Sequence, residues 1–152
     1  MSAQSHTAVA RAQFPYWTRI EVRWGDMDAM GHVNNAVYFK YCESARIELL
    51  RKLGIKGRAE GSTHGPTLVH AACDFKREVK YPATLEVGVA IESVTQRSFR
   101  MQYAMFLDQT DTLIAVATSV NAWLDYHAGH AIKIPDELRA ALQQYQKPEQ
   151  QA

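Results

Sequence analysis

The residue types that could perform chemistry are concentrated in one ten-residue segment, Asp26-Met-Asp28-Ala-Met-Gly-His32-Val-Asn34-Asn35. A long helical pattern follows it directly, so the segment leads into a helix N-terminus, where free backbone N–H groups stabilise negative charge. A carboxylate at such a place could attack a carbonyl carbon or activate water, while the N–H groups polarise the carbonyl oxygen. The same residue types also suit an ordinary capped loop, because Asp and Asn side chains satisfy the N–H groups of turns and helix starts.

Common metal and nucleotide motifs do not fit this chain. The acidic segment begins like an EF-hand loop, but Met30 and Val37 occupy positions where calcium needs oxygen ligands. The His127-x-x-His130 pair has only Asp125 nearby as a further ligand, so the sequence predicts surface histidines and no metal site. The sequence contains neither a GxSxG elbow nor a glycine-rich nucleotide loop.

The elements that must position the acidic segment follow from hydrophobic periodicity. Residues 17–24 alternate between apolar and polar side chains, as a half-buried strand does. Residues 35–53 carry apolar side chains at spacings of three and four, with Asn as N-cap and Gly54 as the stop, which predicts a helix. Further strands are predicted at 67–79, 85–91, 97–108 and 113–125, and a short amphipathic helix at 135–145.

Strands that follow one another without intervening helices favour an antiparallel sheet, and only the long helix is large enough to cover it. The predicted fold class is therefore α+β: an antiparallel five-stranded sheet curled around one long central helix. We expect a single domain over residues 15–146, between a short flexible arm at 1–14 and a polar tail at 147–152.

Composition excludes several kinds of partner. The 152 residues carry a net charge of +1, which gives no strong field for nucleic acid or for an anionic membrane. No apolar run approaches the ~18 residues of a membrane span, and the start lacks the apolar stretch of a secretory signal. Cys42 and Cys73 lie far apart without a CxxC pair. The sequence thus predicts a cytoplasmic protein that binds neither nucleic acid nor membrane.

One family resemblance rests on the segment from Trp24 to Tyr38, which is similar to the signature of hotdog-fold acyl-CoA thioesterases of the 4-hydroxybenzoyl-CoA thioesterase-like family. The likeness covers about residues 18–125 and includes Tyr41-x-Glu43-x-Ala45-Arg46, Asp74-Phe75-Lys76-Arg77 and Tyr81-Pro82. It implies a hotdog fold and hydrolysis of an acyl-CoA to a carboxylic acid and free CoA, without a cofactor. A hotdog hydratase or dehydratase, or a non-catalytic binder of acyl-CoA or acyl-carrier protein, stays open as an alternative.

The resemblance also implies catalytic roles for residues of the acidic segment. Asp28 matches the family's catalytic carboxylate, which acts as nucleophile or as general base. The backbone N–H of Asn35 matches the group that polarises the carbonyl. His32 is a further catalytic candidate, although a loop-structuring role is favoured, and Asp26 is expected to form the turn.

The remaining candidates concern substrate binding and assembly. Asn34 and Tyr38 are candidate substrate contacts, although Tyr38 also fits the apolar seam of the helix. Glu43 and Arg46 are expected to form an i,i+3 ion pair. The candidate phosphate contacts are cations: Lys76, Arg77, Lys80, Arg97 and Arg100.

A single curled sheet leaves an exposed edge strand, which favours pairing with another chain. The resemblance implies a homodimer or homotetramer with the active site at the subunit interface.

Overall fold

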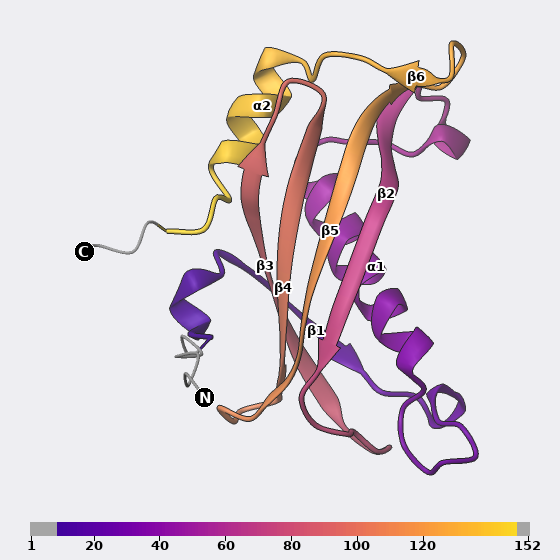
Figure 1. The fold of residues 1–152 in the computed structure, drawn as a ribbon, viewed down its shortest axis with the longest axis vertical. Helices are drawn as coiled ribbons and strands as arrows, with labels where there is room; N and C mark the ends of the chain where they lie inside the picture. The colour runs from indigo at the N-terminus through magenta and orange to yellow at the C-terminus, as the bar shows by residue number, and fades with distance from the viewer. Residues whose placement is uncertain (1–8, 149–152) are drawn as a thin grey trace, which may run out of the picture.

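The computed structural model describes residues 9–148 as one curled sheet with a long helix on one face. Its elements are η1 (Arg11–Gln13), β1 (Tyr16–Glu21), η2 (Trp24–Asp26), α1 (Asn35–Lys52), η3 (Arg58–Glu60), β2 (His64–Phe75), β3 (Thr84–Val94), β4 (Ser98–Leu107), β5 (Leu113–Asp125), β6 (His130–Ala131) and α2 (Asp136–Gln143) (Figure 1).

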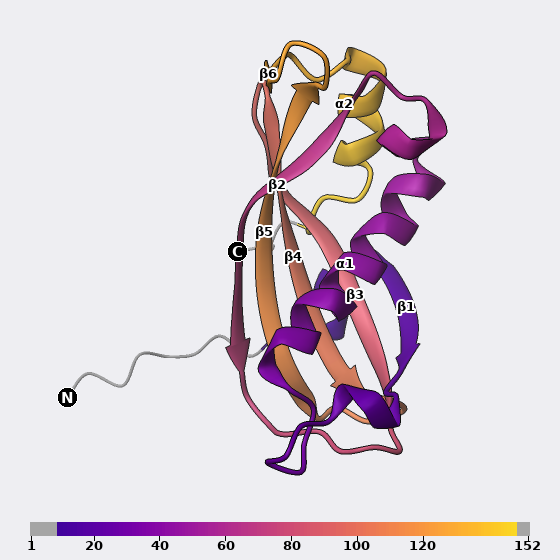
Figure 2. The ribbon, with the colours of Figure 1, turned by 90° about the vertical axis from the view of Figure 1, so that its right-hand side faces the viewer.

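The sheet has the strand order β1-β3-β4-β5-β2, and every pairing between these strands is antiparallel. Figure 2 shows α1 lying against one face of the sheet, with β1 curling round on the helix side. The predicted α+β architecture is therefore confirmed. The two-residue strand β6, which pairs with the end of β5, was not predicted, because two residues carry no periodicity.

Helix α1 is fixed at both ends by the residues that the sequence indicated. The Asn34 side chain accepts a hydrogen bond from the Ala36 N–H, 2.8 Å away, and so caps the helix. Gly54 follows the helix with a φ of +84°, a conformation that side chains other than glycine rarely adopt. Between these ends, Ala45 and Leu49 are completely buried against the sheet.

Four predicted strand boundaries were wrong by two residues or more. β2 begins at His64 instead of residue 67, and β3 ends at Val94 instead of residue 91. The first strand ends at Glu21 because the chain then turns through η2, which leaves the Trp24 side chain 73% exposed instead of aligned with Ile20 and Val22. The strand predicted to end at Val79 ends at Phe75. Beyond it the carbonyl of Val79 accepts from the Val33 N–H at 2.8 Å, outside any strand pairing.

The face of the sheet opposite α1 is covered near its middle by the segment before β1. Phe14 is buried there in a small cluster with Ala90, Ala104 and Phe106. Residues 1–8 of the predicted flexible arm lie outside the described residues, whereas residues 9–14 pack on the sheet. The packed domain therefore begins before residue 15.

Gly88 in β3 is required by this packing. A Cβ at position 88 would lie 2.8 Å from the Phe14 Cβ and 2.9 Å from the Trp17 ring. We expect Gly88→Ala to destabilise the fold by ~1–3 kcal/mol, which lowers the Tm by several degrees in a thermal melt. Gly25→Ala is the matched control, because nothing lies within 4 Å of its added Cβ. Equal melting of the two variants would show that the segment does not press on Gly88.

Candidate active site at the start of helix α1

Asp26 joins the loop before α1 to the helix itself. Its carboxylate accepts hydrogen bonds from the Arg23 N–H at 2.9 Å and from the Tyr41 hydroxyl at 2.7 Å. Its carbonyl accepts from the Asn34 N–H at 3.0 Å. Burial and the bond to Asp26 raise the pKa of Tyr41 far above its ordinary value, so the hydroxyl stays a donor. These contacts fit the turn-forming role expected of Asp26.

Asp28 lies half-buried in the same loop, with one hydrogen bond to each carboxylate oxygen. Oδ1 accepts from the Met30 N–H at 2.8 Å, and Oδ2 accepts from the Asn34 side-chain amide at 3.0 Å. These two hydrogen bonds hold the carboxylate in place. Because each carboxylate oxygen can accept two hydrogen bonds, each oxygen still has a free lone pair. The backbone also closes here, since the Asp28 N–H donates to the His32 carbonyl at 3.2 Å.

Asn34 connects the carboxylate to the helix start. Its Nδ2 donates to Asp28 while its Oδ1 caps Ala36, so one amide group orients both. Asn34 stays a predicted substrate contact, and its two hydrogen bonds also fit a role in positioning Asp28. The sequence signal for this was its place directly before the helix, where a side-chain oxygen is expected to cap.

Asn35 is the first residue of α1 and is exposed. Within residues 9–148, its backbone N–H has no hydrogen-bond acceptor. The partial positive charge of the helix N-terminus is therefore available at this N–H.

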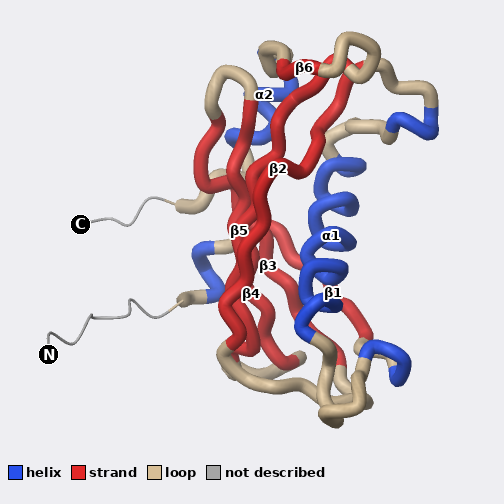
Figure 3. Tube along the Cα trace, turned by 45° about the vertical axis from the view of Figure 1, so that its right-hand side comes forward, coloured by secondary structure: helices blue, strands red, loops and turns tan. Residues whose placement is uncertain are grey.

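A cavity of about 210 Å³ lies beside Asn35. It brings together five of the predicted site residues: His32, Asn35, Tyr38, Lys76 and Arg77. These residues meet because the loop before α1 and the connection between β2 and β3 lie at the same end of the molecule, as Figure 3 shows.

Hydrogen bonds and ring contacts hold the walls of this cavity. The backbone N–H groups of Lys76 and Arg77 both donate to the Ile114 carbonyl, at 2.9 and 3.1 Å. The rings of Tyr38 and Phe75 meet edge to face at 5.1 Å, and Tyr38 is buried. His32 Nδ1 lies 3.1 Å from the Val33 carbonyl, a contact that fits a loop-structuring role.

The other predicted phosphate contacts do not line this cavity. Arg97 precedes β4, which begins at the end of the sheet that carries α2 and β6, opposite to the start of α1 (Figure 1). Arg100 pairs with Glu92 at 2.6 Å. Lys80 lies 3.9 Å from Glu78 in the connection between β2 and β3.

The predicted Glu43–Arg46 ion pair was wrong. Arg46 is only 6% exposed, and its Nη1 donates to the Tyr103 hydroxyl at 3.3 Å, whereas Glu43 faces solvent. No ion pair joins Arg46 to a carboxylate within the part of the chain that the structure describes. The signal was present in the sequence, because Arg46 follows Cys42 by four residues and precedes Leu49 by three, on the buried seam.

The two cysteines do not offer an alternative nucleophile. Burial raises the pKa of Cys42 to about 12 and that of Cys73 to about 11, so both thiols stay protonated near neutral pH. Among residues 9–148, no three His, Cys, Asp or Glu side chains come together to hold a metal ion. None of the helices in this range is long and apolar enough to cross a membrane.

Comparisons with known proteins agree with this fold. Residues 22–142 match the thioesterase-like superfamily. A 1,4-dihydroxy-2-naphthoyl-CoA hydrolase of Synechococcus elongatus is 27% identical over 125 residues, which cover 80% of this chain and 90% of the relative. The crystal structure of the PA5185 protein of Pseudomonas aeruginosa superposes with a TM-score of 0.85 at 28% identity, over 92% of this chain and 97% of that one.

A further solved structure shares the fold at lower identity. It is Slr0204 of Synechocystis, a 1,4-dihydroxy-2-naphthoyl-CoA thioesterase, with a TM-score of 0.77 at 19% identity over 84% of this chain and 94% of that one. The chain therefore belongs to the thioesterase-like superfamily and has the hotdog fold. Its enzymatic class is thioester hydrolase.

Proposed function

We propose that this protein is an acyl-CoA thioesterase, which converts an acyl-CoA and water into a carboxylic acid and free CoA. The observation that carries the proposal is the Asp28 carboxylate, which Asn34 holds beside a helix start whose first N–H, that of Asn35, has no acceptor in residues 9–148. We assign CoA as the thiol part of the substrate because the relative named above is a hydrolase of a CoA thioester.

The mechanism follows from where charge develops. The thioester carbonyl oxygen would accept a hydrogen bond from the Asn35 N–H, and the dipole of α1 would stabilise its growing negative charge. Asp28 then acts in one of two ways. It attacks the carbonyl carbon, so that CoA thiolate leaves and water hydrolyses the mixed anhydride, or it removes a proton from the attacking water. Either route is complete without a cofactor, and we propose that none is used.

Two other readings of the site make different predictions. A hydratase or dehydratase would act on the acyl chain and leave the thioester intact, and a binder would leave the whole molecule intact. Membership of the thioesterase-like superfamily favours hydrolysis over both. Release of free thiol from acyl-CoA or from acyl-carrier protein is the measurement that separates them.

Lys76 and Arg77 are the cations that we propose for the CoA phosphates. Both line the cavity beside Asn35, and phosphate recognition needs cations at the mouth of the site. Arg97 directly precedes strand β4 and Arg100 lies near its start, at the far end of the sheet, so neither contacts a substrate at this cavity unless a second subunit brings it there.

We also propose a homodimer or homotetramer, assembled through the outer edge of β2. This strand pairs only with β5 in the described residues, and its Leu68 and Val69 side chains are 46% and 59% exposed. Such an edge can pair with a second copy. The two free cysteines fit a reducing compartment, so the cytoplasmic location is kept as part of the proposal.

Arg46 gives this interface a specific contact. A cavity of about 130 Å³ at the β2 edge is lined by Glu43, Arg46, Leu68 and Ala71, among others, so these four residues lie at one level along the sheet. A two-fold axis through the middle of β2 would pass close to both charged residues. The buried guanidinium could then pair with Glu43 of the second copy, and the reverse.

The first prediction concerns Asp28. Asp28→Asn preserves the shape of the side chain and removes its capacity as nucleophile or base, so we expect kcat on the best acyl-CoA to fall at least ~10²–10⁴-fold. Asp26→Asn should cost less than about tenfold, because the amide oxygen of Asn can still accept the bonds from the Tyr41 hydroxyl and the Arg23 N–H that hold the loop. Thermal melts show whether each variant is folded. A folded Asp28→Asn enzyme within tenfold of wild type would remove Asp28 from the mechanism.

The second prediction concerns the phosphate contacts. Lys76→Ala and Arg77→Ala are expected to raise KM with little change in kcat, since uniform binding is lost, and raised salt should weaken wild-type binding in the same direction. Arg19→Ala on β1, at the opposite edge of the sheet, is the control and should leave KM unchanged. Unchanged KM in both variants would place the phosphate contacts elsewhere.

The third prediction concerns the subunit contact. Glu43→Gln is expected to weaken self-association at least tenfold, because truncating one partner of a buried charge pair typically costs ~2–5 kcal/mol. Sedimentation across a concentration series measures this, with Glu137→Gln on α2 as the matched exposed control. A fully active wild-type monomer at micromolar concentration would contradict the dimer, and unaltered association of Glu43→Gln would contradict the pair.

A further inference from the structure

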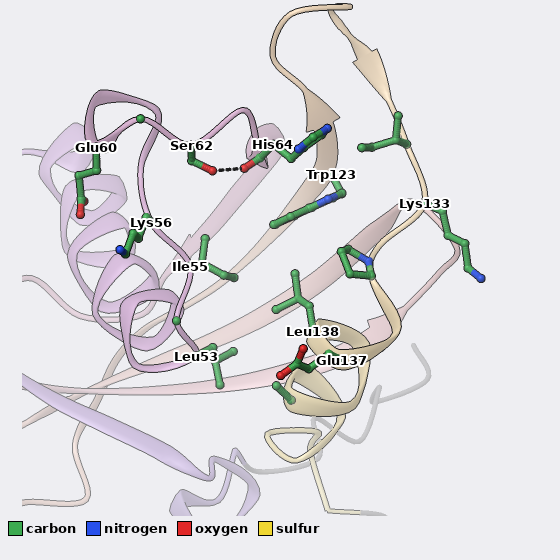
Figure 4. Close-up of a pocket in the computed structure, with 15 residues that line it drawn as sticks. Leu53, Ile55, Lys56, Glu60, Ser62, His64, Trp123, Lys133, Glu137 and Leu138 are labelled. Atoms are coloured by element: carbon green, nitrogen blue, oxygen red, sulfur yellow. Dashed lines mark hydrogen bonds between the residues drawn. The ribbon is translucent and has the colours of Figure 1, made fainter.

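Two cavities away from Asp28 differ in what they offer a ligand. The larger, of about 980 Å³, lies at the far end of α1, and Trp123 and Leu138 are among the residues that line it (Figure 4). The Trp123 indole N–H has no hydrogen-bond partner in the described residues, but its nitrogen is fully buried, so a ligand in that cavity cannot reach it. The smaller cavity, of about 130 Å³ at the β2 edge, is lined by Arg46 and so presents a buried charge.

Arg46 brings unused hydrogen-bond donors to the smaller cavity. A guanidinium has five N–H donors. In the described residues, that of Arg46 donates only to the Tyr103 hydroxyl, at 3.3 Å, and has no counter-ion. Among the described residues that are not exposed, only Trp123 has a completely buried side-chain nitrogen or oxygen without a partner. The remaining guanidinium nitrogens of Arg46 are therefore still accessible to a small molecule, although the side chain is only 6% exposed.

Two hydroxyl groups beside Arg46 add a further donor. Tyr103 and Ser119 line the same cavity, and their oxygens lie 2.8 Å apart in a hydrogen bond that either can donate. The Ser119 oxygen also accepts from the Asn121 side-chain amide at 3.3 Å. When Tyr103 donates to Ser119, both lone pairs of the Ser119 oxygen are occupied and its hydrogen is free. A buried cluster that offers N–H and O–H groups in this way is complementary to an anion.

The volume and the walls of the cavity restrict which anion fits. An empty cavity of about 150 Å³ can hold one benzene molecule, so a cavity of about 130 Å³ admits an anion of only a few heavy atoms. Lys40 and Glu43 also line the cavity with opposite charges, which leaves Arg46 as the excess charge. A planar carboxylate matches the fork of a guanidinium. A short hydrocarbon tail on that carboxylate suits the other walls, most of which are apolar: Phe39, Leu68, Ala71, Ala72 and Ala117.

We infer that this cavity is a binding site for short aliphatic carboxylates, such as propanoate, and that a bound carboxylate excludes Glu43 of the second copy from Arg46. The exclusion rests on the proposed assembly through β2. Because the free anion binds the separated chain in place of the partner's carboxylate, it shifts the equilibrium toward separated chains. The proposed hydrolysis releases carboxylates, so a short-chain product would regulate the assembly of the enzyme that forms it.

Calorimetric titration with sodium propanoate tests the site itself. Glu43→Gln is the protein to titrate, since it keeps Arg46 and removes the competing carboxylate. For a ligand of five heavy atoms we expect a Kd of about a millimolar. Adding Arg46→Gln should weaken binding at least tenfold, whereas adding Arg19→Gln, the matched control on the exposed face of β1, should leave it unchanged. Adding Ala71→Leu instead fills the cavity from an exposed strand position, so it should abolish binding even where Arg46→Gln fails to fold.

Sedimentation of the wild type tests the competition between the two carboxylates. With one site on each chain, propanoate at about three times its Kd should raise the dimer dissociation constant about 16-fold relative to sodium chloride of equal ionic strength. Propanamide has the same shape without the charge and should leave the constant unchanged. An unchanged constant in propanoate would overturn the competition.

The calorimetric result does not depend on hydrolysis or on assembly. Saturable binding that requires Arg46 supports the carboxylate site even where no thiol is released from acyl-CoA and the proposed function fails. Absence of saturable binding to folded Glu43→Gln overturns the site. Undiminished binding after Arg46→Gln or Ala71→Leu in folded protein also overturns it, because propanoate would then bind elsewhere.

Discussion

The candidate site depends on two side chains that attach the loop before α1 to the helix. Asp26 accepts from the Tyr41 hydroxyl in the second turn of the helix and from the N–H of Arg23, the residue directly before η2. The side-chain amide of Asn34 caps the helix with its oxygen and donates to the Asp28 carboxylate with its nitrogen. Because α1 is itself packed against the sheet through a fully buried seam, these bonds give a loop carboxylate the rigidity of the core.

Much of this arrangement was predictable from local signals. The capping Asn34 and the stop at Gly54 define α1 because both act within a few residues of the helix ends. The catalytic candidates form one run of sequence, so their proximity needed no tertiary information. The order of strands without intervening helices likewise implied an antiparallel sheet.

The errors and omissions have a common physical origin, which is contact between distant segments. The end of β1 could not be located because the Asp26–Tyr41 bond joins residues fifteen positions apart. Arg46 was assigned to its neighbour Glu43, whereas its partner Tyr103 lies on β4. The predicted cations lie at two different ends of the sheet, because the strands that carry or precede them run in opposite directions. A local sequence pattern does not indicate the direction of a strand. The cavity beside Trp123 is lined by four separate segments, so no single stretch of the sequence predicts it.

The isolated chain has an energetic imbalance at Arg46. A guanidinium that is 6% exposed with a neutral hydroxyl as partner has lost most of its hydration without gaining a counter-ion. The second subunit that we propose would supply the carboxylate and would bind the folded chain only, so by mass action it would add to the free energy of unfolding. Folding and assembly would then be thermodynamically linked, and the melting temperature of this protein would rise with its own concentration.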